Sequence, residues 1–209
     1  MTRASRLSGR GAARACRAGE AGQLLLELVI AAGVACVLGG AVAPQLTAQR
    51  DAATAAAAAR HVGALMHDAR ARSLRHGTTT ALVFRTDGLS IAFAAFVDGN
   101  RNGVLSADIA RGADRQVTPW GTLGDNFPRA SFGIIPGATD PDSGAPLAGT
   151  PLKIGGSGIL SFGPDGTSTS GTLYVRGPGL QQFALRALGA TGRTRLLRFD
   201  PGPGTWTSP

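Results

Sequence analysis

Cysteine is scarce in this chain of 209 residues and occurs only as Cys16 and Cys36. The sequence after Cys36 can therefore form neither a disulfide nor a cysteine-based metal or redox site. It also contains no His-Glu-x-x-His pattern, no Gly-x-Ser-x-Gly motif and no glycine-rich phosphate loop. The three histidines, His61, His67 and His76, are expected to be solvated or partly packed. We therefore predict that the protein is not an enzyme and needs no cofactor for catalysis.

Acidic residues are rare at the N-terminal end, where Glu20 is the only one before Gln23. Five arginines lie in the same segment: Arg3, Arg6, Arg10, Arg14 and Arg17. The formal net charge of +8 comes partly from them, because the chain from Gln23 onward carries 16 basic and 12 acidic residues. A basic segment in front of an apolar run stays in the cytoplasm. These arginines therefore need no nucleic acid to explain them.

A long apolar run begins directly after Gly22. Residues Leu24 to Ala43 carry a single charge, Glu27, and their length of about 20 residues is that of a helix that crosses a bilayer. A carboxylate near the start of such a helix costs roughly 2.5 kcal/mol or more, and less near the interface. Because of this cost, we expect Glu27 to have a function.

The Gly22-Gln23 junction, Glu27 and the apolar run together resemble the class III signal of type IV pilins and pseudopilins. The resemblance implies that a prepilin peptidase cuts between Gly22 and Gln23 and methylates the new N-terminus. It also implies that the helix remains as a membrane anchor and later becomes part of a filament core. The sequence departs from the family at Gln23, where Phe or Met is usual.

Two other interpretations of this segment stay open. Ala41-Val42-Ala43 fits a secretory cleavage site, but Pro44 would follow the cut. The apolar run is also longer than the roughly 7–15 residues of an ordinary secretory signal. A plain single-pass anchor explains the length of the run. It explains neither Glu27 nor the glycine junction.

Helical composition continues past the apolar run to about His76. The stretch 52–59 is rich in alanine, the best helix former. Further apolar or small side chains recur at helical spacing and form one narrow stripe: Val62, Leu65, Met66, Ala69 and Ser73. Gly77 is a plausible helix stop. We therefore predict one helix over residues 23–77, with its last turns packed on a globular domain.

Pro44 lies inside this predicted helix and removes a hydrogen bond to the carbonyl of Gly40. One interpretation is a simple kink or the end of the membrane span. The resemblance to pilins implies another, in which the helix loosens at Pro44 during filament assembly.

From Thr78 onward the pattern changes to short runs separated by Gly, Pro, Asp and Asn. The predicted strands are Thr79–Arg85, Leu89–Val97, Ser131–Ile135, Ile159–Phe162, Thr172–Arg176, Gln182–Ala187 and Arg195–Phe199. We predict an α+β fold in which a long N-terminal helix, transmembrane and then amphipathic, packs on an antiparallel β-sheet domain in the manner of pilins. The predicted domains, as the resemblance implies, are a cleaved leader (1–22), the helix (23–77, spanning the membrane to about residue 43) and a periplasmic β domain (78–209).

Further motifs resemble the H-type minor pseudopilins and their pilus relatives, the GspH/FimT family. They are residues 68–73 with His76-Gly77 at the helix end, the loop 96–103, the strand and turn 159–166, and Gly192-Arg193-Thr194-Arg195. The resemblance implies a minor pilin or pseudopilin, a structural subunit in the tip or initiation complex of a type II secretion pseudopilus or a type IV pilus. The implied partners are the prepilin peptidase, other minor pilins through the N-terminal helix, and the inner membrane. The implied location is the inner membrane, single-pass, with a cytoplasmic N-terminus and a periplasmic C-terminal domain.

Asp98, Asn100, Asn102 and Gly103 match the first half of a calcium loop, with oxygen ligands at alternate positions. The second half fails, because Ile109 stands where a bidentate Glu is needed. Asn, Asp and Gly also favour tight turns without an ion. A structural turn and a Ca²⁺ site are therefore both open interpretations.

Arg193 and Arg195, with Arg186 and Arg198 nearby, form a basic cluster outside the leader. One interpretation is a solvated face of the last hairpin. The other is a patch that contacts the phosphates of DNA, as the resemblance to pilus proteins of DNA uptake implies. A DNA-binding minor pilin is thus the alternative function.

Overall fold

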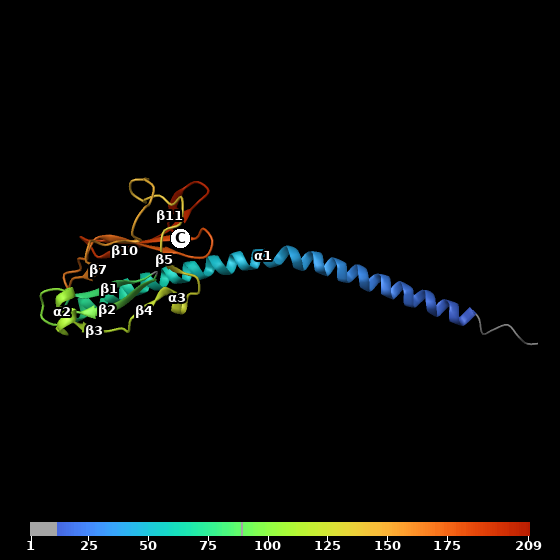
Figure 1. The fold of residues 1–209 in the computed structure, drawn as a ribbon, viewed down its shortest axis with the longest axis horizontal. Helices are drawn as coiled ribbons and strands as arrows, with labels where there is room; N and C mark the ends of the chain where they lie inside the picture. Colours follow the sequence, from blue (N-terminus) through green and yellow to red (C-terminus); the bar gives the residue numbers. More distant parts are fainter. Residues whose placement is uncertain (1–11, 89) are drawn as a thin grey trace, which may run out of the picture. The chain divides into compact units, whose positions relative to one another are not determined.

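The computed structural model describes the backbone of residues 12–88 and 90–209, and the side chains of residues 22–36, 45–88 and 90–209. The chain divides into two compact units, Met1–Gln49 and Arg50–Pro209. Helix α1 (Ala12–His76), 65 residues long, contributes to both units. Every described strand belongs to the second unit (Figure 1).

Helix α1 begins at Ala12, earlier than the predicted start at Gln23. The physical reason lies in the composition of residues 12–26, which are mostly Ala, Arg, Glu, Gln and Leu, all strong helix formers. Gly19 and Gly22 each cost about 1 kcal/mol relative to alanine, which is too little to stop a helix with such neighbours. The Gly22-Gln23 junction is therefore no boundary of secondary structure. Residues 1–11 of the predicted leader lie outside the described chain.

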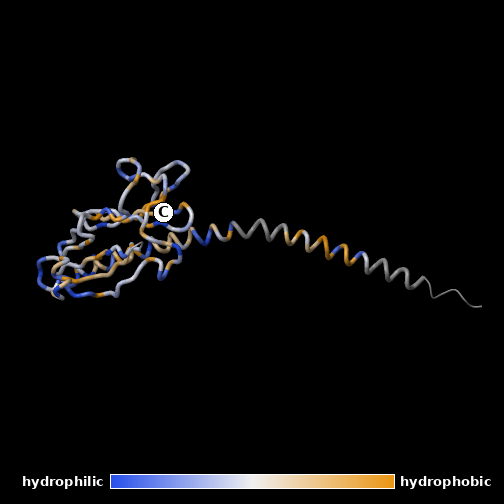
Figure 2. Tube along the Cα trace, viewed as in Figure 1, coloured by the Kyte–Doolittle hydropathy of each residue, from blue (hydrophilic) through white to orange (hydrophobic). Residues whose placement is uncertain are grey.

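In the first unit, the described part of α1 exposes its apolar side chains. They are between 58% and 67% exposed for Leu24, Leu25, Leu26, Leu28, Val29 and Ile30. Figure 2 colours part of the helix trace in this unit as hydrophobic. Among the described residues, no helix has both the length and the hydropathy that crossing a membrane requires. The side chains of residues 37–44, which complete the predicted span and include Pro44, lie outside the described set.

In the second unit, α1 ends where the sequence predicts. Gly77 takes a φ of 63°, which a residue with a side chain rarely adopts, and its N–H donates to the carbonyl of Ser73 at 3.0 Å. The Ser73 side chain is fully buried, and its hydroxyl lies 3.1 Å from the carbonyl of Gly163. This contact attaches the end of the helix to the turn after β7 (Ile159–Phe162).

The predicted apolar stripe of α1 is confirmed as the face that enters the core. Val62, Met66, Ala69 and Ser73 are buried, and Leu65 is partly buried. The stripe also extends toward the N-terminus through three fully buried alanines: Ala55, Ala58 and Ala59. These small side chains let the backbone at Gly177 approach the helix closely, since a Cβ added at Gly177 would lie 2.2 Å from that of Ala55.

The strands form two antiparallel sheets. Sheet A has the order β3-β2-β1-β7, and β4 also pairs with β2. Its strands are β1 (Thr80–Asp87), β2 (Ser90–Val97), β3 (Arg115–Gln116), β4 (Gly121–Thr122) and β7. Sheet B has the order β11-β10-β9-β8-β5, and β6 also pairs with β8. Its strands are β5 (Ser131–Phe132), β6 (Leu152–Lys153), β8 (Gly171–Arg176), β9 (Gln182–Leu188), β10 (Arg193–Asp200) and β11 (Thr205–Thr207).

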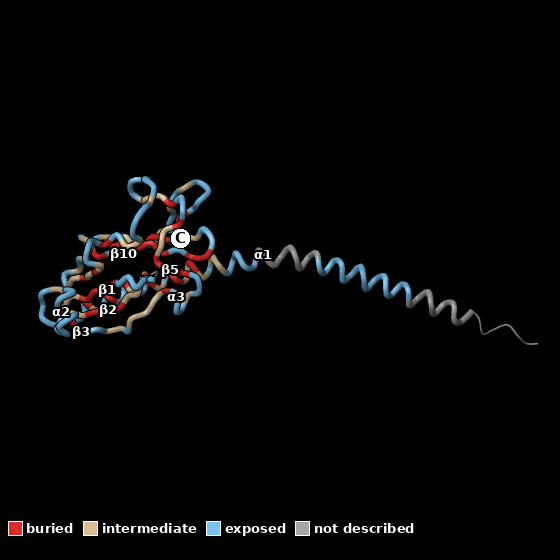
Figure 3. Tube along the Cα trace, viewed as in Figure 1, coloured by how far each residue is buried: buried red, intermediate tan, exposed pale blue. Residues whose placement is uncertain are grey.

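The main core joins α1 to both sheets (Figure 3). It contains the buried stripe of α1 together with side chains of β1, β7, β8 and β9, among them Leu82, Phe162, Leu173 and Phe183. Two smaller clusters cover the other faces. Val104, Ile109 and Trp120 pack on sheet A, where Arg85 also lies 4.2 Å from the centre of the Trp120 ring. On sheet B, Phe199 packs with residues including Ile135, Ala138 and Trp206.

The α+β class with antiparallel sheets is confirmed, and most predicted strands recur with ends shifted by one or two residues. The range Ile159–Phe162 recurs unchanged. Ser131–Ile135 is a strand only over its first two residues. Two short helices, α2 (Ser106–Arg111) and α3 (Leu123–Asn126), and strands β3, β4, β6 and β11 are absent from the prediction.

Candidate functional site

The predicted processing and assembly residues lie on α1 in the first unit. Gly22, Gln23 and Glu27 are exposed, and Glu27 has no ion-pair partner among the described residues. Gln23 and Glu27 are four residues apart on one helix, so they share a face and their Cβ atoms lie roughly 6 Å apart. The backbone of Pro44 belongs to α1, which continues on either side of it.

Gly22 has no structural reason to be glycine. A Cβ added there would meet no atom of the described residues within 4 Å, and its φ is not in the left-handed region. A helix-interior glycine costs about 1 kcal/mol relative to alanine. The described contacts therefore give no packing reason for a glycine at position 22.

The predicted Asp/Asn/Gly loop after β2 is held by three buried carboxylates. Asp98 accepts backbone N–H groups of Asn100, Arg101 and Gly103 at 3.1, 2.7 and 2.7 Å. Asp114 accepts the N–H groups of Gly99 and Leu105 at 3.2 and 2.9 Å. These bonds hold the backbone of the loop in place.

The third carboxylate of this loop is Asp108, on α2. It accepts the side-chain amides of Asn100 and Asn102 at 3.2 and 2.9 Å, and it pairs with Arg111. The Arg111 guanidinium, followed by the amides of Asn102 and Asn100, lowers the pKa of Asp108. Among the described residues, no three His, Cys, Asp or Glu side chains are grouped to hold a metal. The Ca²⁺ interpretation of Asp98, Asn100 and Asn102 stays a prediction.

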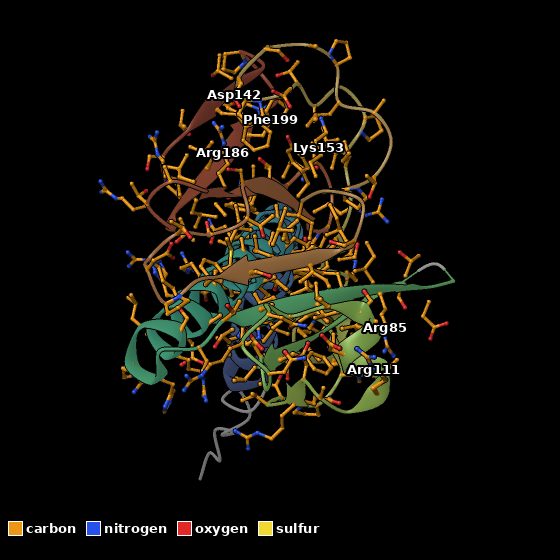
Figure 4. All side chains as sticks on the ribbon, turned by 90° about the vertical axis from the view of Figure 1, so that its left-hand side faces the viewer. Arg85, Arg111, Asp142, Lys153, Arg186 and Phe199 are labelled. Carbon is orange, nitrogen blue, oxygen red and sulfur yellow. The ribbon has the colours of Figure 1, made fainter. Side chains whose placement is uncertain are left out.

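The basic cluster separates into two faces of sheet B. Arg195 is paired with Arg186 across β9 and β10, so both side chains lie on the same face, and Arg193 joins them by alternation. Arg198 lies on the opposite face. Arg186 is neutralised by Asp142. The two terminal nitrogens of Arg186 donate hydrogen bonds to the two carboxylate oxygens of Asp142, each at 2.6 Å (Figure 4). Within the described chain, the exposed Arg193 and Arg195 have no acidic partner.

A groove of about 360 Å³ lies between α1 and β10. It is lined by Arg60, Gly63, Ala64 and His67 of α1 and by Leu185, Thr194, Arg195 and Leu196 of sheet B. At one place the two walls are joined, because His67 Nε2 lies 3.0 Å from Thr194 Oγ1. The other histidines differ in surroundings: the His61 ring packs at a tilt against Phe127 with ring centres 5.4 Å apart, and His76 is exposed.

The loop 136–151 contains a polar centre at Asp140. Burial alone would raise the pKa of Asp140, but hydrogen bonds from the backbone of Asp142 and Ser143, with the Lys153 ammonium, lower it to about 2. Tyr174 lies beside this carboxylate, and burial, followed by the Asp140 charge, raises the pKa of its hydroxyl. Figure 4 shows Lys153, Asp142 and Arg186 gathered on this side of sheet B.

Sequence reasoning did not find Asp114, Arg111 or the groove. Asp114 lies 16 residues from Asp98, so only the folded loop brings the two together. The adjacent small residues Gly63 and Ala64, next to the apolar stripe of α1, are the one sequence signal that could have indicated a hollow there. Comparisons of the chain with protein-family models, with curated proteins and with solved structures found no match.

Proposed function

We propose that this chain is a minor pilin or pseudopilin, a structural subunit of a type II secretion pseudopilus or of the tip or initiation complex of a type IV pilus. The observation that carries the proposal is the segment Gly22 to Ile30, where a glycine without packing contacts precedes an apolar stretch of α1 that carries a single carboxylate. The exposed leucines of this helix need an apolar environment. A membrane supplies it before assembly, and neighbouring helices supply it afterwards.

The fold of the second unit supports this proposal. A subunit that is anchored by its N-terminal helix needs a folded domain that is firmly attached to that helix. Residues 50–76 of α1 provide one wall of the core of that domain. In the proposal the domain lies in the periplasm and the N-terminus lies in the cytoplasm, on the side of the leader arginines.

The proposed mechanism is assembly rather than catalysis. A prepilin peptidase cuts after Gly22 and frees a positive amine at Gln23. Glu27 of an incoming subunit then pairs with the amine of a neighbour, which sets the axial register of the two helices. In an apolar bundle an unpaired carboxylate is costly, so only the register that pairs it is stable.

Substitution of Glu27 tests this mechanism. Glu27→Ala should insert into the membrane as well as wild type, since removal of a charge makes insertion easier. It should enter filaments or tip complexes poorly, measured by shearing and immunoblotting, whereas Glu27→Asp keeps the charge and should retain part of the function. Equal incorporation of wild type and Glu27→Ala would contradict the pairing.

A deletion strain distinguishes the two systems. Loss of exoprotein secretion with normal pili assigns the subunit to a secretion pseudopilus. Loss of pili or of DNA uptake with normal secretion assigns it to a type IV pilus.

The second candidate function is DNA binding by a pilus subunit, and the observation that favours it is the shared, unpaired face of Arg193 and Arg195. Two arginines would give weak binding to double-stranded DNA without sequence preference. Each lost phosphate contact should lower the log–log salt slope by about 0.9. A titration at two salt concentrations, comparing wild type with Arg193→Ala/Arg195→Ala, decides the matter. Unchanged binding in the double variant would exclude this role for the pair.

A further inference from the structure

Strand β10 has an open edge beside the groove. It pairs with β9 from Arg193 to Arg198 and with β11 only from Arg198 to Asp200. On that second side, residues 193–197 have no strand partner among the described residues, and none of their backbone groups bonds to another loop there. At about 3.4 Å per residue the open edge is roughly 17 Å long. An edge of this kind can accept a further strand.

The groove lies directly along this edge. Its floor is formed by Gly63 and Ala64 of α1 and by Leu185 of β9. A Cβ at Gly63 would lie 3.5 Å from Leu185 Cδ2, so helix and sheet are in contact beneath the groove. A strand added to β10 would cover this floor with every second side chain. The space suits small apolar side chains.

The charges around the edge select the kind of strand. Arg193 and Arg195 stand on one face of β10, and Arg60 stands on α1 across the groove. None of the three has an acidic partner in the described part of the chain. A second copy of β10 would bring its own arginines against these, which is unfavourable for directly facing like charges. Acidic side chains at alternate positions of an added strand would complement Arg193 and Arg195.

We infer that the open edge of β10 binds an extended segment of a partner protein in which acidic and small apolar residues alternate. The segment adds a strand to sheet B. Its acidic side chains lie beside Arg193 and Arg195, and its apolar side chains cover Gly63, Ala64 and Leu185. This inference rests on the second unit alone and holds whether or not the chain is a pilin.

The probe is the fluorescein-labelled peptide acetyl-Glu-Val-Glu-Val-Glu-Val-Glu-amide, titrated by fluorescence anisotropy with the full-length protein in neutral detergent micelles. Saturable binding is expected. A scrambled peptide of the same composition should bind at least about tenfold more weakly, because it cannot place its charges and its apolar side chains on opposite faces. Equal binding of the scrambled peptide would show attraction by charge alone and would overturn the inference.

Backbone methylation tests strand addition itself. In an extended peptide the N–H groups of the glutamates point to one edge and those of the valines to the other. Methylation of all valine amides, or of all glutamate amides, therefore blocks opposite edges while the side chains stay the same. One methylated peptide should bind like the parent and the other should lose binding. The peptide that still binds shows which edge faces β10 and therefore gives the direction of the added strand. Equal binding of both would overturn the inference.

Protein variants locate the site. Arg193→Glu/Arg195→Glu should weaken peptide binding by about tenfold or more, and Ala64→Trp, which fills the groove from the exposed face of α1, should do the same. Arg198→Glu is the control for one charge reversal on the same strand but on the opposite face, and it should change the affinity by less than about twofold, whereas Arg195→Glu alone should weaken it more. Circular dichroism melts establish that each variant is folded. Equal weakening by the control and by the double variant would contradict the assignment of the site.

Discussion

Protonation of Asp140 should cost the protein a measurable part of its stability. The carboxylate is 22% exposed and accepts hydrogen bonds from two backbone N–H groups and from Lys153, which lower its pKa from the ordinary 3.8 to about 2. Because the pKa in the folded state is the lower one, the stabilisation is fully present above pH 3.8 and is lost as the pH falls through 2. The difference of about 1.8 between the two values corresponds to about 2 kcal/mol.

The assay is urea unfolding of the full-length protein in mild detergent, followed by the fluorescence of Trp206 in a Trp120→Phe background. Trp206 reports on this region, because its indole N–H donates to the carbonyl of Thr139 at 2.7 Å. Asp140→Asn should lower the unfolding free energy by about 2 kcal/mol at pH 6 and by well under 1 kcal/mol at pH 2. Asp87→Asn, in the exposed β1–β2 hairpin, is the control. Parallel pH dependence of wild type and Asp140→Asn between pH 6 and 2 would contradict a stabilising role of the ionised Asp140.

Two further predictions concern the fold. A fragment from Ala48 to Pro209 should be soluble, monomeric and folded without reducing agent, because it lacks both cysteines and the exposed apolar stretch of α1. Aggregation in light scattering, or a coil spectrum in circular dichroism, would contradict this prediction. Gly192→Ala should destabilise the protein by about 1–3 kcal/mol in urea unfolding, since Gly192 has a φ of 57° and an added Cβ would lie 2.4 Å from the carbonyl oxygen of Gly166. Gly202→Ala, whose added Cβ has no contact closer than 3.5 Å, should change it little.

Much of the fold follows from local sequence signals. The end of α1 at Gly77 and the β1–β2 hairpin depend on residues next to each other in the chain, and both were predictable. Strands β3, β4 and β6 have two residues each and are defined by their partners alone, so no periodicity can reveal them. Helix α2 is similar, because Asp108 on it is fixed by Asn100 and Asn102 of the preceding loop.

The candidate sites show the same division. The processing and assembly roles of Gly22 and Glu27 rest on neighbouring residues, so they can be proposed from the sequence alone, and they stay predictions. The basic cluster was only partly readable, since Arg186 is neutralised by Asp142, 44 residues away. Because side chains alternate between the two faces along β10, Arg198 lies on the face opposite to Arg195. This assignment depends on the register of β10 with β9. The groove arises from α1 and sheet B together and has almost no local signal.

The most direct test of the proposed function is the N-terminus of the mature protein. The protein should be extracted from membranes of cells that contain a prepilin peptidase and measured by intact and peptide mass spectrometry. We predict a chain that begins with N-methylated Gln23, and a full-length precursor for Gly22→Leu or in cells without the peptidase. An intact leader in the wild-type protein, or a mature chain that begins at Pro44, would contradict it.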